Sequence, residues 1–234
     1  MSSDTDSMEL IELESFEPES DDANASQRRR RTTIRLGAAA IAVVALIVVL
    51  AVLPIAGVTY PYSRAIVPSL SDPSDAALKA FGLTPVLLAV AGLTVVALVR
   101  ALPYGIGAVI TLVVGASLTT AAVRTWADGL VPASALPNGN VTACIALICA
   151  ATLVASRAFL PMVWGLGTVA AATVSAGAVL GGSATVVGIF TTAAIVAAWW
   201  AGSSAVMLYS PVAAEREAQN PLDTAAMALK RRLG

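Results

Sequence analysis

Histidine is absent from the 234 residues, and cysteine occurs only twice. Histidine and cysteine are the usual protein ligands of zinc, copper, haem and iron–sulfur groups, and no acidic residues cluster inside the apolar segments to replace them. We therefore expect no metal and no other cofactor. Cys144 and Cys149 are five positions apart in one apolar segment. On a helix they point in different directions, so we expect no disulfide between them.

Charge is also scarce, since charged residues make up 12% of the chain, hydrophobic residues 57%, and the mean hydropathy is +0.81. This composition is typical of an integral membrane protein. The few charges are segregated: nine of the 15 acids lie between Asp4 and Asp22, and four arginines run from Arg28 to Arg31. The chain does not begin with the basic, apolar and small-residue order of a signal peptide, so we expect the first apolar segment to stay attached. We expect no nucleic-acid partner.

The chain divides into three parts. Residues 1–33 are acidic, end in a basic cluster, and have too few bulky apolar groups to offset the entropy of ordering, which predicts a disordered cytoplasmic tail. Residues 34–208 are predicted to be an all-α domain with six transmembrane helices, because six apolar segments each approach the ~20 residues that cross a bilayer. Residues 209–234 are predicted to be a second cytoplasmic tail with a short basic helix. The six apolar segments are 36–58, 84–102, 104–123, 141–156, 159–180 and 184–208.

The basic residues predict the orientation, because cytoplasmic segments retain Lys and Arg. If the N-terminus is inside, eleven basic residues lie on the cytoplasmic side and three on the outer side. Both termini are then cytoplasmic, as an even number of spans requires, in a multi-pass protein of a bacterial plasma membrane. In the first outer loop, residues 76–81 are expected to form an interfacial helix. The three outer basic residues are Arg64, Lys79 and Arg124, and the inner ones are Arg28, Arg29, Arg30, Arg31, Arg35, Arg100, Arg157, Arg216, Lys230, Arg231 and Arg232.

Three short patterns fall at the outer ends of the last four segments. Arg124 is followed after six residues by Val131-Pro132, then comes Pro137-Asn138-Gly139-Asn140, and finally Ser175-Ala176 is followed after five residues by Gly182 and after three more by Val186. In spacing and order these resemble the three motifs of the type 2 phosphatidic acid phosphatase superfamily: Lys, six residues, Arg-Pro; Pro-Ser-Gly-His; and Ser-Arg, five residues, His, three residues, Asp. The resemblance covers roughly residues 76–205 and implies a lipid-phosphatase-like bundle.

The resemblance also implies which positions once carried the chemistry. In active members the third-motif His attacks phosphorus, a neighbouring Asp orients it, and the second-motif His protonates the leaving oxygen. Those positions are here Gly182, Val186 and Asn140. Two positions that would hold the phosphoryl oxygens are here Val131 and Ala176, so all five are degenerate catalytic positions.

These replacements predict that the chain is not an enzyme. Asn140 can donate a hydrogen bond but cannot release a proton at neutral pH, and Gly182 has no side chain. Ser175 and Ser183 have no adjacent base, and Asp128 is the only acid in the two motif-bearing outer loops. A hydroxyl without activation is a poor nucleophile, so we expect no catalytic residue.

A remnant binding site for a lipid phosphate or another anion is a separate hypothesis, because a helix start with a nearby arginine favours negative charge. A structural interpretation stands beside it: Arg124 ends the third span at the interface, and the turn at residues 137–140 leads into a helix with Asn140 as its N-cap. The residues of the hypothetical site are Arg124, Asn138, Gly139, Asn140, Ser175 and Ser183.

Together these features predict a catalytically inactive accessory subunit, structural or regulatory, of a bacterial membrane complex such as envelope-lipid machinery or a respiratory supercomplex. Its partners would be membrane lipids and other membrane subunits, contacted through the spans and the N-terminal tail. The Ala- and Val-rich composition with more Arg than Lys is typical of actinobacteria. The alternative is an active lipid or polyprenyl phosphate phosphatase with a non-standard site. A transporter is less favoured, because the spans hold almost no ionisable residues.

Two adjacent tryptophans, Trp199 and Trp200, lie in the last apolar segment. Neighbouring positions on a helix point ~100° apart. We therefore expect at least one of the two rings to face lipid or a partner subunit.

Overall fold

The structure is a computed structural model that describes residues 18–60, 82–100, 103–156 and 158–208. Within these residues the protein is all-helical and contains no strand, only an isolated bridge between Asp128 and Val131. The all-α expectation is thus confirmed for the described residues, whereas residues 1–17, the expected interfacial helix 76–81 and the tail 209–234 lie outside them. The elements are α2 (Pro18–Ile47), a π-helix η1 (Val48–Val52), α3 (Leu53–Ile55), α5 (Leu83–Val99), α6 (Pro103–Trp126), α7 (Gly139–Val154), α8 (Leu160–Leu180) and α9 (Val186–Met207).

Four helices are long and apolar enough to cross a membrane: Ala25–Ile55, Tyr104–Trp126, Leu160–Leu180 and Val186–Met207. The two other apolar helices are shorter, since α5 has 17 residues and α7 has 16. At 1.5 Å per residue each is about 25 Å long, less than the ~30 Å of hydrocarbon in a typical bilayer. The structure therefore shows four candidate spans among six apolar helices, and six crossings remain a prediction.

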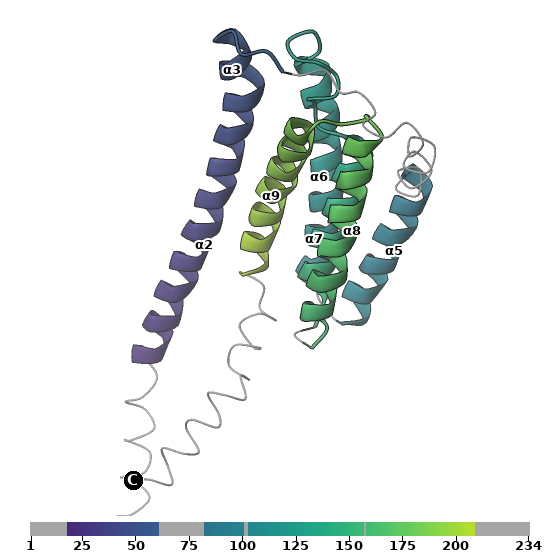
Figure 1. Ribbon diagram of the computed structural model, residues 1–234. Helices are drawn as coiled ribbons and strands as arrows, with labels where there is room; N and C mark the ends of the chain where they lie inside the picture. Colours follow the sequence, from purple (N-terminus) through teal and green to yellow (C-terminus); the bar gives the residue numbers. More distant parts are fainter. Residues whose placement is uncertain (1–17, 61–81, 101–102, 157, 209–234) are drawn as a thin grey trace, which may run out of the picture.

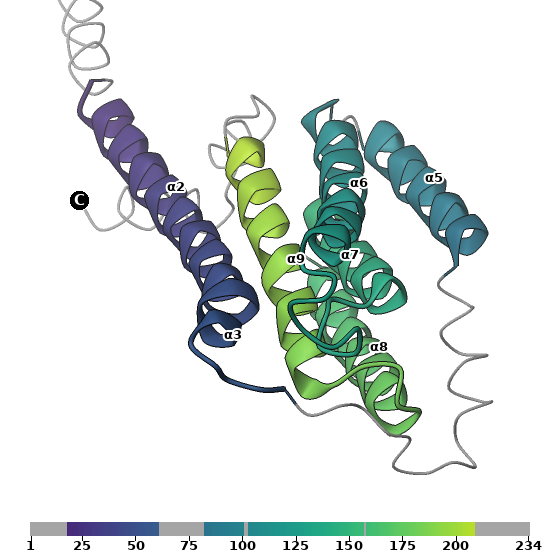
Figure 2. The same ribbon diagram turned by 90° about the horizontal axis from the view of Figure 1, so that it is seen from above.

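Helices α6, α7 and α9 pack against one another and form the centre of the bundle. Helix α8 packs on α7, α5 packs on α6 and α7, and α2 packs on α9 at the opposite side (Figure 1). Figure 2 shows the same order from above, with α2 and α5 at the two edges. Aliphatic residues of α5, α6, α7 and α9 fill the main core, including Val109, Leu112, Val154, Ile195 and Val196.

Helix α2 begins at Pro18, well before the first apolar segment. Residues 18–33 of the segment expected to be a disordered tail thus belong to this helix in the structure. The local sequence gives the reason: Pro is favoured at a first helical position, acids at 19, 21 and 22 suit the positive end of the helix dipole, and Ala, Gln and Arg have high helix propensity. A polar composition excludes a core but does not exclude a helix.

Both tryptophans of α9 turn their indole nitrogens toward neighbouring helices. Trp199 Nε1 donates to Thr119 Oγ1 of α6 at 2.9 Å, and Trp200 Nε1 donates to Thr152 Oγ1 of α7 at 3.2 Å. Trp200 also meets Trp164 of α8 edge to face, with ring centroids 6.3 Å apart. Both rings are only half-buried, so the expectation that at least one faces lipid or a partner subunit stays a prediction. In apolar surroundings the indole N–H needs an acceptor, and the threonines supply it.

A proline explains the π-helix at the end of the first span. Leu53 N–H donates to Val48 O, five residues earlier in the chain. In the same five-residue pattern Val49 O would accept from residue 54, but residue 54 is proline and has no N–H. The Tyr60 hydroxyl donates to Val49 O. Burial raises the pKa of Tyr60, so the hydroxyl keeps the proton that it donates. The chain segment after the helix thus returns to satisfy the carbonyl that proline leaves without its helical partner.

Tyr60→Phe should lower the free energy of unfolding in detergent by about 1–3 kcal/mol, the cost of a buried polar group that loses its partner. The loss should be smaller in a Pro54→Ala background, where residue 54 regains an N–H for Val49 O. Because the pKa of Tyr60 is raised on folding, its stabilising effect should be complete below the unfolded pKa near 10 and disappear at higher pH.

Chemical denaturation of the two single variants and the double variant measures this coupling. Tyr104→Phe is the matched control, because Tyr104 is an exposed tyrosine at the start of α6. Equal losses for Tyr60→Phe in both backgrounds would contradict the explanation.

Candidate functional site

The three motif regions lie at the same end of the bundle, where the α6–α7 loop meets the α8–α9 turn (Figure 1). Thr185 joins the two connections, because its N–H and its hydroxyl both donate to Ser134 O, at 2.8 and 3.1 Å. Gly188 allows the close approach, since an added Cβ there would lie 2.6 Å from the same Ser134 oxygen. Arg124, Asn140 and Gly182 are therefore on one side of the protein, as the motif order predicts.

Arg124 lies in the last turn of α6, where a positive charge complements the helix dipole. Its Nη1 donates to Pro137 O at 2.9 Å, so the guanidinium joins the end of α6 to the end of the α6–α7 loop. The side chain is nevertheless exposed. This geometry matches the structural interpretation of Arg124, and it leaves the residue accessible to an anion.

Asn138, and not Asn140, is the N-cap of α7. The Asn138 Oδ1 atom accepts hydrogen bonds from Asn140 N at 3.1 Å and Val141 N at 3.3 Å. The expectation that Asn140 caps this helix is therefore wrong; both asparagines suit the role, and the helix begins two residues earlier than the pattern suggested. The capping side chain occupies two of the amides that a bound anion would otherwise use.

A buried threonine network continues from this cap into the bundle. Thr142 Oγ1 donates to Asn138 O at 2.9 Å, so in the buried Thr120–Thr142 pair, 3.0 Å apart, Thr120 is the donor. Thr192 Oγ1 donates to Gly188 O at 2.8 Å and accepts from Asn138 N at 3.0 Å. The network ties α6, α7 and α9 together. The sequence did not predict this network, because threonine is frequent in the apolar segments and nothing distinguishes positions 120, 142 and 192 from the others.

Gly182 ends helix α8. Its φ of +79° lies in the left-handed region that favours glycine. Gly182 N–H donates to Val179 O at 3.1 Å and Ser183 N–H donates to Ala178 O at 2.9 Å, the two bonds of a Schellman motif. Ser183 Oγ donates to the same Ala178 oxygen at 3.1 Å. The position that the resemblance assigns to a nucleophile is thus occupied by a residue that the turn itself requires.

The remaining motif positions have different surroundings. Val131 is buried in a small core under the α6–α7 loop, together with Leu50 of the π-helix and Ala127. Ala176 is exposed, and Val186 is 72% exposed. Val131 and Ala176, the positions that would hold phosphate oxygens, and Val186, the position that would orient a nucleophile, therefore do not line a common pocket.

The chemistry available at this end is limited. Within residues 103–156 and 158–208, the charged side chains are those of Arg124 and Asp128. Asp128 is exposed on the α6–α7 loop. Ser175 is half-buried on α8, Gly139 is exposed at the start of α7, and Ser183 donates to a backbone carbonyl. A serine activated for attack would instead donate to a general base. The arrangement holds loops and helix ends together.

No protein-family model matches the chain, and neither a curated protein nor a solved structure matches it. The resemblance to the type 2 phosphatidic acid phosphatase superfamily therefore remains a prediction that rests on the motif residues quoted above.

Asn138→Ala should lower the free energy of unfolding by about 1 kcal/mol, because α7 loses its cap and two amides lose an acceptor. Asn140→Ala, two residues along the same helix, should change it by less than about 0.5 kcal/mol. Denaturation of both variants in the same detergent makes the comparison. A larger loss for Asn140→Ala would show that the cap has been assigned to the wrong asparagine.

Proposed function

We propose that the chain is a catalytically inactive integral membrane protein that serves as a structural or regulatory accessory subunit of a bacterial membrane complex. The observation that carries the proposal is that the polar side chains at the motif-bearing end, where the α6–α7 loop meets the α8–α9 turn, bind backbone groups. Arg124, Asn138 and Ser183 each form hydrogen bonds with backbone groups of the loops and helix ends. These side chains stabilise the scaffold, and none is arranged as a nucleophile with a base.

The proposed topology has six crossings with both termini in the cytoplasm. Helix α7 is short for a crossing, but it packs against α6, α8 and α9, so much of its surface contacts protein and not lipid. A short apolar helix at the edge, such as α5, is accommodated by local thinning of the bilayer at a modest cost. The basic residues Arg35 and Arg100 then lie near the cytoplasmic surface.

Two side chains test this topology. Ala133 is exposed in the α6–α7 loop and Ala158 is exposed between α7 and α8, at the opposite end. In a background with Cys144 and Cys149 replaced by alanine, a membrane-impermeant maleimide should label Ala133→Cys in intact cells and Ala158→Cys only after permeabilisation. The reverse pattern would invert the orientation, and labelling of both sites in intact cells would exclude the six-span arrangement.

The accessory role is supported by the exposed position of α2. This helix packs on α9 and leaves large aliphatic side chains outward, with Ile41 73% and Val44 59% exposed. Apolar side chains in this position face acyl chains or the helices of another subunit. Because the helix continues from the membrane into the N-terminal segment, it offers a partner both an apolar surface and a charged one.

Affinity purification in mild detergent should recover a defined set of partner subunits with the full chain. Ile41→Trp should remove them by placing a bulky ring on the outward face of α2, and Val169→Trp on α8 is the matched control, because Val169 is 66% exposed. A chain that elutes alone would contradict the accessory role. Phosphate release from phosphatidic acid by the pure protein, abolished by Ser183→Ala, would favour the phosphatase alternative.

A further inference from the structure

An apolar groove runs along the side of the bundle that is opposite α2. Helix α7 forms its floor, and α5 and α8 form its walls. It consists of two adjoining hollows of about 600 and 390 Å³, which share Leu93, Ala151 and Val163. None of the motif residues discussed above lines either hollow, so the groove is a different place in the molecule from the candidate site.

The walls stay apart because each packs on α7. On the α8 side the packing is close, since an added Cβ at Gly167 would collide with Ile148 of α7. On the α5 side two of the lining residues, Ala89 and Gly92, are small, and an added Cβ at Gly92 would meet no atom within 4 Å. Gly92 thus contributes open space between the helices.

The length of the groove corresponds to one leaflet of a bilayer. Along α5 its lining extends from Ala89 to Arg100, twelve residues that span about 16 Å. Half of a ~30 Å hydrocarbon layer is about 15 Å. A single acyl chain lying in the groove would therefore extend from the middle of the membrane to the level of Arg100.

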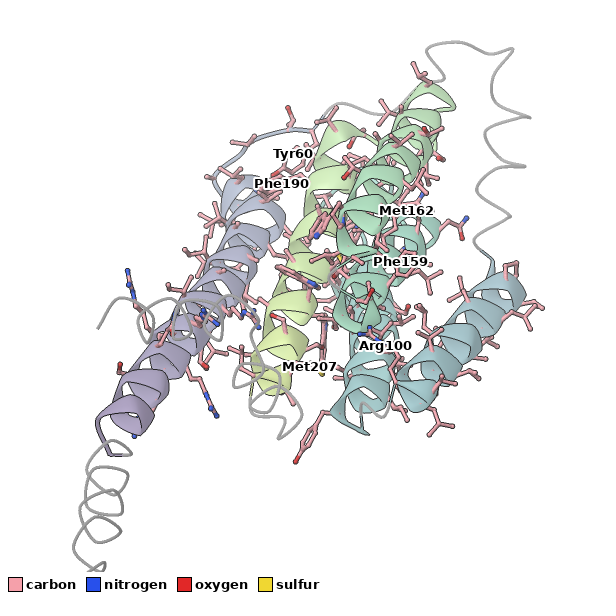
Figure 3. The ribbon with its side chains drawn as sticks, turned by 90° about the horizontal axis from the view of Figure 1, so that it is seen from below. Tyr60, Arg100, Phe159, Met162, Phe190 and Met207 are labelled. Carbon is pink, nitrogen blue, oxygen red and sulfur yellow. The ribbon has the colours of Figure 1, made fainter. Side chains whose placement is uncertain are left out.

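The end of the groove carries a positive charge. Arg100 Nη1 donates to Val154 O, the last carbonyl of α7, so the guanidinium is held at the mouth. Figure 3 labels Arg100, Phe159 and Met162 on the side of the bundle that faces α5. Phe159 and Met162 are 64% and 59% exposed, and no acidic side chain lines the two hollows.

We propose that this groove binds an anionic glycerophospholipid, with one acyl chain between α5 and α8 and the headgroup phosphate beside Arg100. The apolar lining takes the chain, and the arginine charge attracts the phosphate, as guanidinium groups do in phosphate sites. Arg100 is the one charged side chain among the residues that line the two hollows, and an apolar helix of another protein would bring no anionic group to it. The inference goes beyond the proposed accessory role and does not depend on it, since it uses no residue of the motif-bearing end.

The test measures lipid selectivity in vesicles. The full-length protein is reconstituted in phosphatidylcholine with a trace of phosphatidylglycerol or phosphatidylcholine that carries a nitroxide on one acyl chain, and the immobilised fraction is read by electron paramagnetic resonance. We expect about a five-fold preference for phosphatidylglycerol, the factor typical of one basic residue near an anionic lipid. Arg100→Gln should remove the preference, and Arg100→Lys should retain most of it.

Matched glycine variants test the groove itself. Gly92→Phe should fill the space for the chain and reduce the immobilised phosphatidylglycerol at least two-fold, whereas Gly107→Phe on α6 should not. Both glycines have no atom within 4 Å of an added Cβ. Thermal unfolding of each variant shows whether it is folded.

Four results would overturn the proposal. Equal immobilisation of the two lipids would mean ordinary boundary lipid. A preference removed by Arg124→Gln and not by Arg100→Gln would place the anion at the other end of the protein. A preference that Gly92→Phe leaves unchanged would mean that no chain occupies the groove. A dimer broken by Gly92→Phe, without lipid selectivity, would mean that a second copy occupies it.

Discussion

The structure depends on one constraint: backbone groups at helix ends in apolar surroundings must find hydrogen-bond partners within the protein. Each end uses a different residue for this purpose. Tyr60 binds the carbonyl opposite Pro54, Asn138 caps α7, and Arg100 binds the last carbonyl of the same helix. A Schellman turn at Gly182 ends α8. These residues also connect neighbouring segments. The hydrogen bonds that pair the backbone groups at the helix ends therefore also fix how the helices are arranged.

This constraint gives a physical meaning to the motif-bearing end. In spacing and order the sequence there resembles a phosphatase pattern that has lost its histidines, and the structure shows what the residues at these positions do. Asn138 and Gly182 are needed for a helix start and a helix end, and Arg124 holds the loop between two helices. The contacts that these residues make are structural, which supports the proposal of a non-catalytic protein.

Hydropathy alone predicted most of the helices closely, but not the start of α2. The segments expected at 104–123, 159–180 and 184–208 correspond to Pro103–Trp126, Leu160–Leu180 and Val186–Met207. Local pattern could not choose between Asn138 and Asn140 as a cap, because the two asparagines are chemically alike and only the path of the chain distinguishes them. It also could not reveal the groove. That feature arises between α5 and α8, which are far apart in the sequence and meet only through α7.

Helix α2 passes through the basic cluster without a break. Four consecutive residues of an α-helix are turned by about 100° from one to the next, so Arg28 to Arg31 point to all sides of the helix and form a collar around it. A row of charges on one face would favour one direction of tilt. If α2 crosses a membrane as proposed, a collar would instead limit how far the helix can slide toward the bilayer centre, because arginines on all sides of the helix would meet the headgroups at nearly the same depth.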